Sequence, residues 1–386
     1  MLTRPGHHSN VISPAVSHAS DAATAVAELA AQIDPDEICF LLVFVPVGLD
    51  RDRLAAEMLS QFAGIPVFGC TAAGQITPQG YDSSALLAIG FSRAHFRCAS
   101  MLISPLKPFS IKDVSDQARK LAGDFHKTAH WNRLGLVLAD GTSKQEDILA
   151  ATLATALNDI PVFGGSASDG LEFRETLILH GGRFHPNAAL LILLDTDMEF
   201  RGLGFDHFQP TDTQMVVTDA VPDERLVLEI NGTSAAREYA RMVGCAVEDL
   251  SAEIFAENPV LVRNNALYHV RSIKEVHPDG TLSLISAIDV GLLLTLGKGQ
   301  EILRTLADEL CVTDAAGHAP EFILGFDCIL RRLEIDQKQL GAEVSQLMRQ
   351  ARVLGFNTYG EQHCGVHVNQ TFVGVAFFPP QQRALH

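Results

Sequence analysis

PVFGCTAAGQ at residues 66–75 returns as PVFGGSASDG at residues 161–170, and this repeated glycine turn decides the fold. In each copy the turn follows a continuous apolar run, at residues 38–48 and 134–140, and then a helical stretch. Both runs are too short for buried helices and are typical of strands that are buried on both faces. The sequence therefore predicts that one unit of strand, helix and glycine turn occurs twice.

The repetition reaches beyond the two turns. Pro66 and Pro161 lie 95 positions apart, and we expect the same offset to hold from each strand to its turn. Each copy then continues into a further strand, so the duplicated units span residues 38–91 and 134–194. A period of this length indicates a domain duplication, because solenoid repeats are much shorter.

A third, weaker copy lies near the C-terminus. It has an apolar run at residues 323–329, a helical stretch at 337–352, the turn VLGFNTYGEQ at 353–362 and a last strand in TFVGVAFF at 371–378. We therefore predict a mixed α/β fold, in which duplicated modules of strand, helix, glycine turn and strand form mixed sheets flanked by helices.

The chain is long enough for two domains, because a single core stops growing at roughly 250 to 300 residues. We predict an N-terminal segment with the start of the first helix at residues 1–30, a first domain at 31–215 and a second domain at 216–386. Two related halves often leave a cleft between them, and ligand sites favour such clefts.

The composition of the chain restricts which binding partners and which cellular compartment we expect. The net charge of −17 repels nucleic acid and anionic membranes, so neither is an expected partner. Seven scattered cysteines without a CxxC pair fit a reducing compartment. No apolar run is long enough to cross a bilayer, and the N-terminus lacks an apolar signal segment, so we expect a soluble cytoplasmic protein.

The glycine turns are the candidate ligand site, because a strand that runs into a turn of small residues presents backbone N–H groups at a sheet edge. They lack the signatures of nucleotide and hydrolase chemistry. The lysine of a P-loop is absent after Gly74, and Ser168 stands where a nucleophile elbow needs glycine. The candidate ligand-binding residues come from all three turns: Gly69, Cys70, Thr71, Gly164, Gly165, Ser166, Tyr359, Gly360, Glu361 and Asn369.

An enzymatic alternative uses Cys70 or Ser166 as a nucleophile. No base or oxyanion partner can be placed for either side chain, and the position of Cys70 carries Gly165 in the second copy and Phe356 in the third. We therefore rank this alternative last and expect no catalytic residues.

Histidine is the other source of candidate ligands, because neutral imidazole commonly binds iron, copper or zinc. His363 and His367 stand in the segment EQHCGVH beside the third turn. On one continuous strand they would point to the same side, and Cys364 to the other. Either histidine is a candidate metal ligand. The alternative, that both are solvated side chains at the rim, stays open.

The segments GCTAAG, GGSASDG, FDCILRR and LGFNTYGEQ, followed by the ending NQTFVGVAF, resemble the FIST family, in which an N-terminal and a C-terminal FIST domain are joined. The resemblance covers residues 38–377 and marks the two predicted domains as FIST N-like and FIST C-like. Members of the family commonly carry histidine immediately before Asn369, whereas this chain has Val368 there and His367 one place earlier.

The resemblance implies a sensory protein that binds a small ligand and acts with signal-transduction partners. One branch of the family binds haem, senses nitric oxide and regulates histidine kinases or cyclic-di-GMP enzymes in trans. Membership of that branch would make haem the cofactor, with His363 or His367 on its iron and Arg183 or Arg271 on a propionate. The alternative is a haem-free sensor of a small metabolite such as an amino acid. A homo-oligomer is compatible with both.

Overall fold

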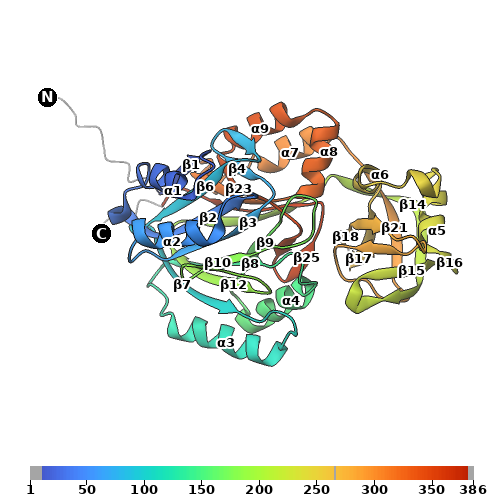
Figure 1. The fold of residues 1–386 in the computed structure, drawn as a ribbon, viewed down its shortest axis with the longest axis horizontal. Coiled ribbons are helices and arrows are strands. Elements are labelled where there is room, and N and C mark those ends of the chain that lie inside the picture. The colour runs from blue at the N-terminus through green and yellow to red at the C-terminus, as the bar shows by residue number, and fades with distance from the viewer. Residues whose placement is uncertain (1–10, 265–266, 381–386) are drawn as a thin grey trace.

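The computed structural model describes residues 11–264 and 267–380, which form a body and a smaller lobe (Figure 1). Within these ranges the strands build three six-stranded sheets and one eight-stranded sheet, with helices packed against them. None of the described helices is both long and apolar enough to cross a membrane. The predicted mixed α/β class is confirmed.

Each predicted copy supplies the centre of one six-stranded sheet. The first sheet has the order β1 (Ile12–Ser17), β6 (Leu86–Ser92), β2 (Ile38–Pro46), β3 (Val67–Ala72), β10 (Ile178–His180) and β11 (Arg183–His185). The second has the order β7 (Phe96–Ile103), β12 (Ala189–Thr196), β8 (Asn132–Ala139), β9 (Val162–Ser166), β24 (Glu361–His363) and β25 (Val366–Val368). The third has the order β13 (Phe200–Phe205), β26 (Phe372–Phe377), β22 (Phe322–Cys328), β23 (Val353–Thr358), β4 (Gln75–Thr77) and β5 (Gly80–Asp82). The same pairing pattern therefore occurs three times.

The three copies exchange hairpins in a ring. The hairpin of β4 and β5, which follows the turn of the first copy, pairs with β23 of the third copy. The third copy's hairpin of β24 and β25 pairs with β9 of the second copy, and the second copy's hairpin of β10 and β11 pairs with β3 of the first. Each glycine turn therefore carries the chain from its own sheet into a neighbouring sheet, and the three sheets close into one body.

Gly69, Gly164 and Gly355 occupy the same place in the three copies, where two parallel strands pair. A Cβ at these positions would lie 1.9, 1.8 and 1.7 Å from a carbonyl oxygen of the neighbouring strand. Close strand packing therefore accounts for these glycines. The strand register also shows that the predicted offset of 95 positions between the first two copies does not hold throughout. Val43 and Val137, the partners of Gly69 and Gly164, are 94 positions apart, whereas the two glycines are 95 apart, so the second copy has one extra residue between its strand and its turn.

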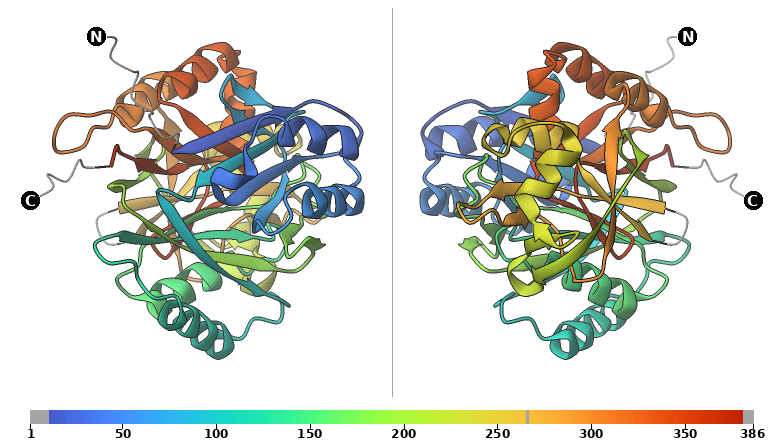
Figure 2. Two further views of the ribbon diagram at one scale, coloured as in Figure 1. Left: turned by 90° about the vertical axis from the view of Figure 1, so that its left-hand side faces the viewer. Right: turned by 90° about the vertical axis from the view of Figure 1, so that its right-hand side faces the viewer.

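A shared apolar core fills the space between the three sheets, and a separate core lies under the helices of each copy. The central core is rich in phenylalanine: the rings of Phe44 and Phe356 stack 4.5 Å apart and join the first copy to the third. The outer helices lie on three sides of the strands (Figure 2). They are α1 (Ala22–Ala30) and α2 (Arg51–Gln61) on the first sheet, α3 (Ile111–Asp124) and α4 (Glu146–Leu157) on the second, and α7 (Ile302–Leu310) and α9 (Gly341–Gln350) on the third, with α8 (Ile329–Gln337) directly after β22.

Local chemistry sets where the first helices begin. Asp21 and Asp50 precede α1 and α2, and each carboxylate accepts a hydrogen bond from the backbone N–H three residues further on. Such caps satisfy N–H groups that have no partner within the helix. In both helices the apolar residues follow at helical spacing and are buried against the first sheet. This spacing explains why the two segments are helices rather than further strands.

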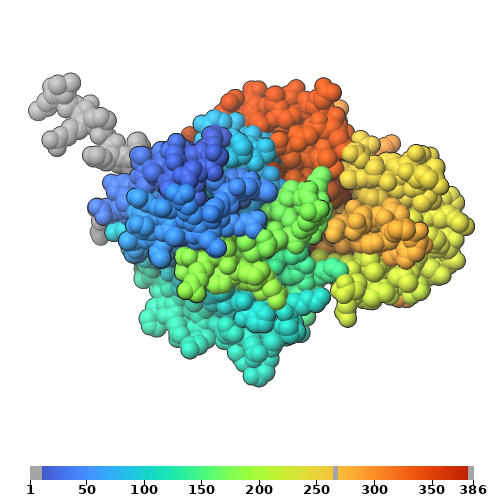
Figure 3. Space-filling model, in the orientation of Figure 1, coloured from blue at the N-terminus to red at the C-terminus, as the bar shows by residue number. Residues whose placement is uncertain are grey.

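The lobe, residues 208–299, is an insertion between the second copy and most of the third. Its elements are β14 (Phe208–Val221), β15 (Leu226–Ile230), β16 (Thr233–Ser234), α5 (Ala235–Val243), α6 (Ala252–Glu257), β17 (Val260–Asn264), β18 (Leu267–Arg271), β19 (Ile273–Val276), β20 (Leu282–Leu284) and β21 (Leu293–Gly299). It has its own apolar core, which includes Tyr239 and Phe255, and it packs against one side of the body (Figure 3). The predicted boundary between residues 215 and 216 lies inside β14, the first strand of the lobe.

Candidate functional site

The exchanged hairpins create three equivalent junctions, and one of these junctions is polar. Opposite the three paired glycines stand Ile76, Leu179 and Gln362. At the preceding hairpin position the polar residues are Gln75 in the first copy and Glu361 in the third. Of the three junctions, the one between β9 and the third copy's hairpin is therefore polar at both positions. The lobe docks at this same junction.

Arg225 fastens the lobe to the body. Its guanidinium lies 2.6 Å from a carboxylate oxygen of Glu146 and 3.0 Å from one of Asp147, the first two residues of α4, and its side chain is only 5% exposed. Burial raises the pKa of Glu146, and the charge of Arg225 opposes this rise. Asp147 also accepts a hydrogen bond from the N–H of Ala287 in the lobe, at 3.1 Å. The first turn of α4 is thus an acidic docking point.

The loop that follows the third copy's hairpin is the second docking point. Ser286 donates a hydrogen bond to Oδ1 of Asn369, and Ser272 donates one to Oε1 of Gln370 at 2.9 Å. All four side chains are buried between lobe and body. We call the polar residues at this junction the interlobe cluster: Asp147, Ser166, Arg225, Arg271, Tyr359, Gln362, His367 and Asn369.

His367 lies opposite Gln362 in the hairpin and is 2% exposed. The Nε2 of Gln362 lies 3.2 Å from Nδ1 of His367 and 2.9 Å from Oγ of Ser166. A Cβ on Gly360 would lie 2.2 Å from Cε1 of His367, so this glycine makes room for the ring. Burial lowers the pKa of His367 to about 4, and the imidazole is therefore neutral at pH 7. With Nδ1 accepting from Gln362, the ring proton lies on Nε2, which has no partner among the described residues.

Arg271 reaches carbonyl groups rather than carboxylates within the described part of the chain. Its Nη1 lies 3.2 Å from the carbonyl oxygen of His367 and 3.4 Å from that of Val270, and its Nε has no hydrogen-bond partner there. Burial lowers the pKa of Arg271, and the charge of Asp147 opposes this shift. A largely buried guanidinium with unused donors is well suited to bind a carboxylate in two-point geometry.

Aromatic side chains cover the interlobe cluster on the body side. The ring of Tyr359 stacks on Phe173 with centroids 4.2 Å apart, and its hydroxyl donates to Asp169. The Asp169 carboxylate also accepts from the backbone N–H of Phe173, which orders the loop after β9. From the lobe, Nζ of Lys274 lies 4.6 Å from the centre of the Phe173 ring. The contact is a cation–π interaction between lobe and body.

Glu361 is a fully buried carboxyl group on the inner side of the hairpin. Its two oxygens accept hydrogen bonds from the hydroxyls of Thr358 and Thr371, the latter at 2.6 Å. Burial raises the pKa of Glu361 to about 8, against the lowering effect of the two threonine hydrogen bonds. The group is therefore mostly protonated at pH 7.

The structure brings together six of the residues predicted from the sequence: Ser166, Arg271, Tyr359, Gly360, His367 and Asn369. Glu361 lies on the opposite face of the hairpin from Gln362 and His367. Of the remaining predicted residues, Gly164 and Gly165 pair with Gln362 and Glu361 at this junction, and the others lie elsewhere. Cys70 is buried in the central core, where burial raises its pKa, and Gly165 packs against Thr358. The hydroxyl of Thr71 accepts from the N–H of Leu177 at 3.1 Å. Gly69 and Gly164 serve strand packing, and Arg183 is exposed on β11.

His363 and His367 do not point to the same side, so that prediction is wrong. The segment is a hairpin rather than one strand, because Cys364 and Gly365 take left-handed φ values of 48° and 90° and reverse the chain. His367 pairs with Gln362 and His363 pairs with Val366, which places the two imidazoles on opposite faces. His363 packs against Phe163 instead, with ring centroids 5.6 Å apart, and burial lowers its pKa.

The residues expected to hold haem do not form a haem site in this fold. His363 and His367 lie on opposite faces of the hairpin, so they cannot face one haem together. Arg183 belongs to a different sheet from this hairpin, so its strand does not neighbour that of either histidine. Among the described residues, moreover, no three His, Cys, Asp or Glu side chains gather in a way that could hold a metal ion.

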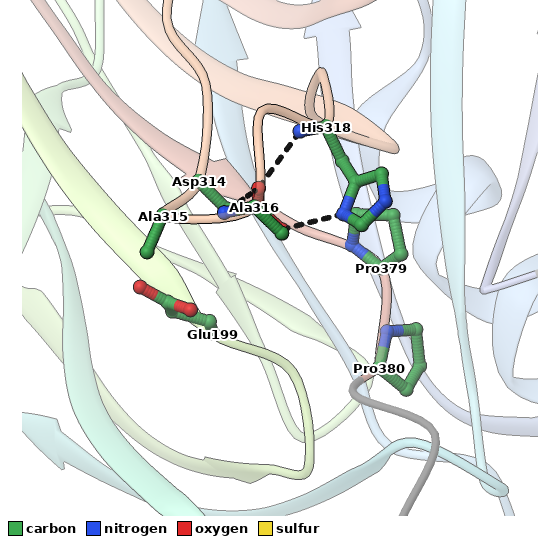
Figure 4. Close-up of a pocket in the computed structure, with 7 residues that line it drawn as sticks. All are labelled: Glu199, Asp314, Ala315, Ala316, His318, Pro379 and Pro380. Atoms are coloured by element: carbon green, nitrogen blue, oxygen red, sulfur yellow. Dashed lines mark hydrogen bonds and ion pairs between the residues drawn. The ribbon is translucent and has the colours of Figure 1, made fainter.

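A surface hollow of about 670 Å³ lies apart from the interlobe cluster (Figure 4). Its lining includes Glu199, Asp314 and His318, and Nδ1 of His318 lies 2.9 Å from Oδ2 of Asp314. Two carboxylates on its wall make this hollow a poor site for an anion, and it shares no lining residue with the cluster.

Four residues of the junction between lobe and body were missed in the sequence: Asp147, Arg225, Ser286 and Gln362. Arg225 follows a Pro-Asp-Glu turn and looks like a solvated loop residue, since a buried arginine has no local sequence signature. Gln362 had a usable signal. It is the last residue of the third glycine turn, and the aligned hairpins of the other copies carry Ile76 and Leu179 at this position.

The sequence matches the models of two protein-family domains. The FIST N domain model matches residues 39–233, and the FIST C domain model matches residues 235–364. An uncharacterised protein of Methanocaldococcus jannaschii, MJ1623, is 22% identical over 210 residues, which is 53% of this chain and 40% of that protein. The chain thus spans about two fifths of that relative. The crystal structure of cyanuric acid hydrolase from A. caulinodans superposes with a TM-score of 0.25 and 10% identity, over 49% of this chain and 72% of that one. At that TM-score the likeness carries no argument.

Proposed function

Because the chain belongs to the FIST family, whose domains are associated with sensing in signal transduction, we propose that it senses a small metabolite that carries a carboxylate. The interlobe cluster is the proposed binding site. One observation carries the proposal: Arg271 is a largely buried cation whose Nε has no hydrogen-bond partner among the described residues. Leaving such a donor unpaired costs free energy, and a ligand carboxylate would supply its partner.

The neighbouring groups narrow the chemistry of the ligand. Besides Nε of Arg271, Oε1 of Gln362 and Nε2 of His367 are buried at this junction without a partner in the part of the chain that the structure describes. Oε1 of Gln362 accepts hydrogen bonds, so it suits an N–H group of the ligand, while Nε2 of His367 donates to an oxygen. A molecule with one carboxylate and one nearby amino group matches this set, and an amino acid is the simplest example.

Ligand entry requires the lobe to move, because the lobe and the stack of Phe173 on Tyr359 cover the cluster. Two short connections join lobe and body, after β13 and before α7, and they bond to each other through N–H of Gln300 and the carbonyl of His207 at 2.7 Å. Adjacent connections of this kind form a hinge. A ligand that bridges Arg271 in the lobe and Gln362 in the body would favour the closed arrangement.

The signal passes through a partner, for which we propose a histidine kinase or a cyclic-di-GMP enzyme. We assign the interlobe cluster to ligand binding rather than to catalysis. Oγ of Ser166 is held by the Gln362 amide, which is not a base, and Cys70 is buried with a raised pKa.

Arg271→Gln should abolish the response to ligand while leaving the fold intact, because Arg271 makes no ion pair with the described residues. In a thermal-shift panel of amino acids and other small carboxylates, wild type should melt at higher temperature with at least one compound. Binding at 100 times Kd stabilises the native state by about 2.7 kcal/mol. The variant should show no shift with that compound.

Arg304→Gln is the matched control, because this exposed arginine pairs only loosely with Asp308 at 3.8 Å, on the far side of α7 from the core. It should keep the full thermal shift. Equal shifts for Arg271→Gln and wild type would refute the site, and a panel without any shift would refute the ligand class. A parallel titration with haemin should leave the Soret band of free haemin unchanged, whereas a shifted band would favour the haem-based alternative.

A further inference from the structure

Cys39 and Cys98 meet between two sheets of the body. Cys39 belongs to β2 of the first sheet and Cys98 to β7 of the second; these two strands lie against each other, and the two thiols are close enough to shift each other's pKa. Both side chains are partly exposed and pack against the edge of the central core. Two thiols from different sheets of the body are therefore neighbours.

The backbone aims Cys39 toward its neighbour. The register between β2 and β6 shifts between Ile38 and Phe40, which makes Cys39 the extra residue of a β-bulge. A bulge turns one side chain out of the regular alternation, and bulges are frequent beside functional groups. Cys98, in contrast, pairs regularly with Leu194 on β12. One thiol is thus presented by an irregularity and the other by a regular strand.

Neighbouring groups shift the pKa values of the two thiols in opposite directions. The interaction with Cys98, together with the charges of Arg97 and Arg93, lowers the pKa of Cys39 to about 7, while the interaction with Cys39 and burial raise the pKa of Cys98. A large fraction of Cys39 is therefore thiolate at neutral pH, and the thiolate is the reactive form of cysteine. Cys98 remains a thiol within reach of it.

We propose that Cys39 and Cys98 are a peroxide-reactive dithiol that closes to a disulfide between the first and second sheets of the body. In the first step the Cys39 thiolate attacks hydrogen peroxide, the O–O bond breaks, and Cys39 becomes a sulfenic acid while hydroxide leaves. In the second step the Cys98 sulfur attacks the Cys39 sulfur, water leaves, and the S–S bond forms. Two thiols and one peroxide thereby become one disulfide and two waters, and a cellular thiol reductant reverses the change.

The disulfide would tie β2 to β7 and close the chain between residues 39 and 98. Because it restrains the unfolded chain, the oxidised protein should melt at a higher temperature than the reduced protein. This site is independent of the interlobe cluster and does not rest on the proposed ligand.

The test uses the full chain, fully reduced, treated with hydrogen peroxide and then blocked with N-ethylmaleimide. Non-reducing peptide mass spectrometry should find the peptide of Cys39 joined to that of Cys98, with the loss of two hydrogens. Cys98→Ser, and Cys98→Ala as a second variant, should instead leave Cys39 as a sulfenic acid that dimedone captures. Cys39→Ser should give neither the linked peptide nor a dimedone adduct on Cys98.

Cys311→Ser is the matched control, since this exposed cysteine lies at the end of α7, and it should cross-link as wild type does. The proposal is overturned if peroxide-treated wild type keeps Cys39 and Cys98 fully alkylated by N-ethylmaleimide. It is also overturned if Cys98 is oxidised as fast in Cys39→Ser as in wild type, because Cys39 would then not be the attacking thiol.

Discussion

Arg225→Met should destabilise the protein by about 3–5 kcal/mol. Arg225 is the buried cation that holds Glu146 and Asp147, and its removal leaves a carboxylate buried without its charge partner. Methionine keeps most of the side-chain volume, so the loss reports the missing charge and hydrogen bonds rather than a cavity. Urea denaturation followed by circular dichroism measures the change.

The matched control is a second ion pair between body and lobe, which lies next to the first in the sequence. Lys144 binds Glu224 at 2.6 Å, but the side chains are 37% and 51% exposed, so Lys144→Met should cost at most about 1 kcal/mol. Because the two pairs lie next to each other, nonspecific damage to the lobe contact would affect both variants. If the two substitutions cost the same, the buried pair would not be what fastens the lobe.

Glu361→Gln should remove a pH dependence of stability between about pH 5 and pH 8. The folded-state pKa of Glu361 is raised to about 8, whereas the carboxyl of the unfolded chain has a pKa of 4.5. Between these values the folded state binds more protons than the unfolded state, so stability falls as the pH rises. At 1.36 kcal/mol per pKa unit, the loss reaches on the order of 4 kcal/mol at pH 8.

Glutamine imitates the protonated carboxyl group but cannot ionise. The free energies of unfolding of wild type and Glu361→Gln should therefore be similar at pH 5 and should diverge toward pH 8, with the variant more stable. Glu309→Gln, a substitution of an exposed glutamate on α7, should follow wild type at every pH. A gap between wild type and Glu361→Gln that stays constant from pH 5 to pH 8 would show that Glu361 is already ionised in the fold.

The modules could be predicted from the sequence because their signals are local. Apolar runs, helical spacing and glycine turns lie within short stretches, and the third copy was recognisable although Phe356 replaces Cys70 and Gly165. The hairpin exchange could not be predicted, because no residue pattern within β4 or β24 indicates which strand that element pairs with. Short hairpins have few side chains with which to specify a partner.

The site was predicted in part for the same reason. Residues inside the third turn, such as Tyr359 and Gly360, were found because the turn itself is a signal. Arg225 and Asp147 were missed, because they come from a lobe loop and a helix start that meet the turn only in the folded chain. The error at His363 has a simpler cause: a two-residue turn at Cys364 and Gly365 was taken for continuous strand.

The ring of exchanged hairpins gives the body the connectivity of a domain-swapped trimer within a single chain. Three separate subunits of about one module each would build the same architecture if every subunit lent its hairpin to the next. The ring also means that no module can be cut out as an independent folding unit, since each would lose one hairpin and expose the strand edge that it covers. Truncation at the boundary between the two family domains should accordingly yield an aggregating fragment rather than a smaller stable protein.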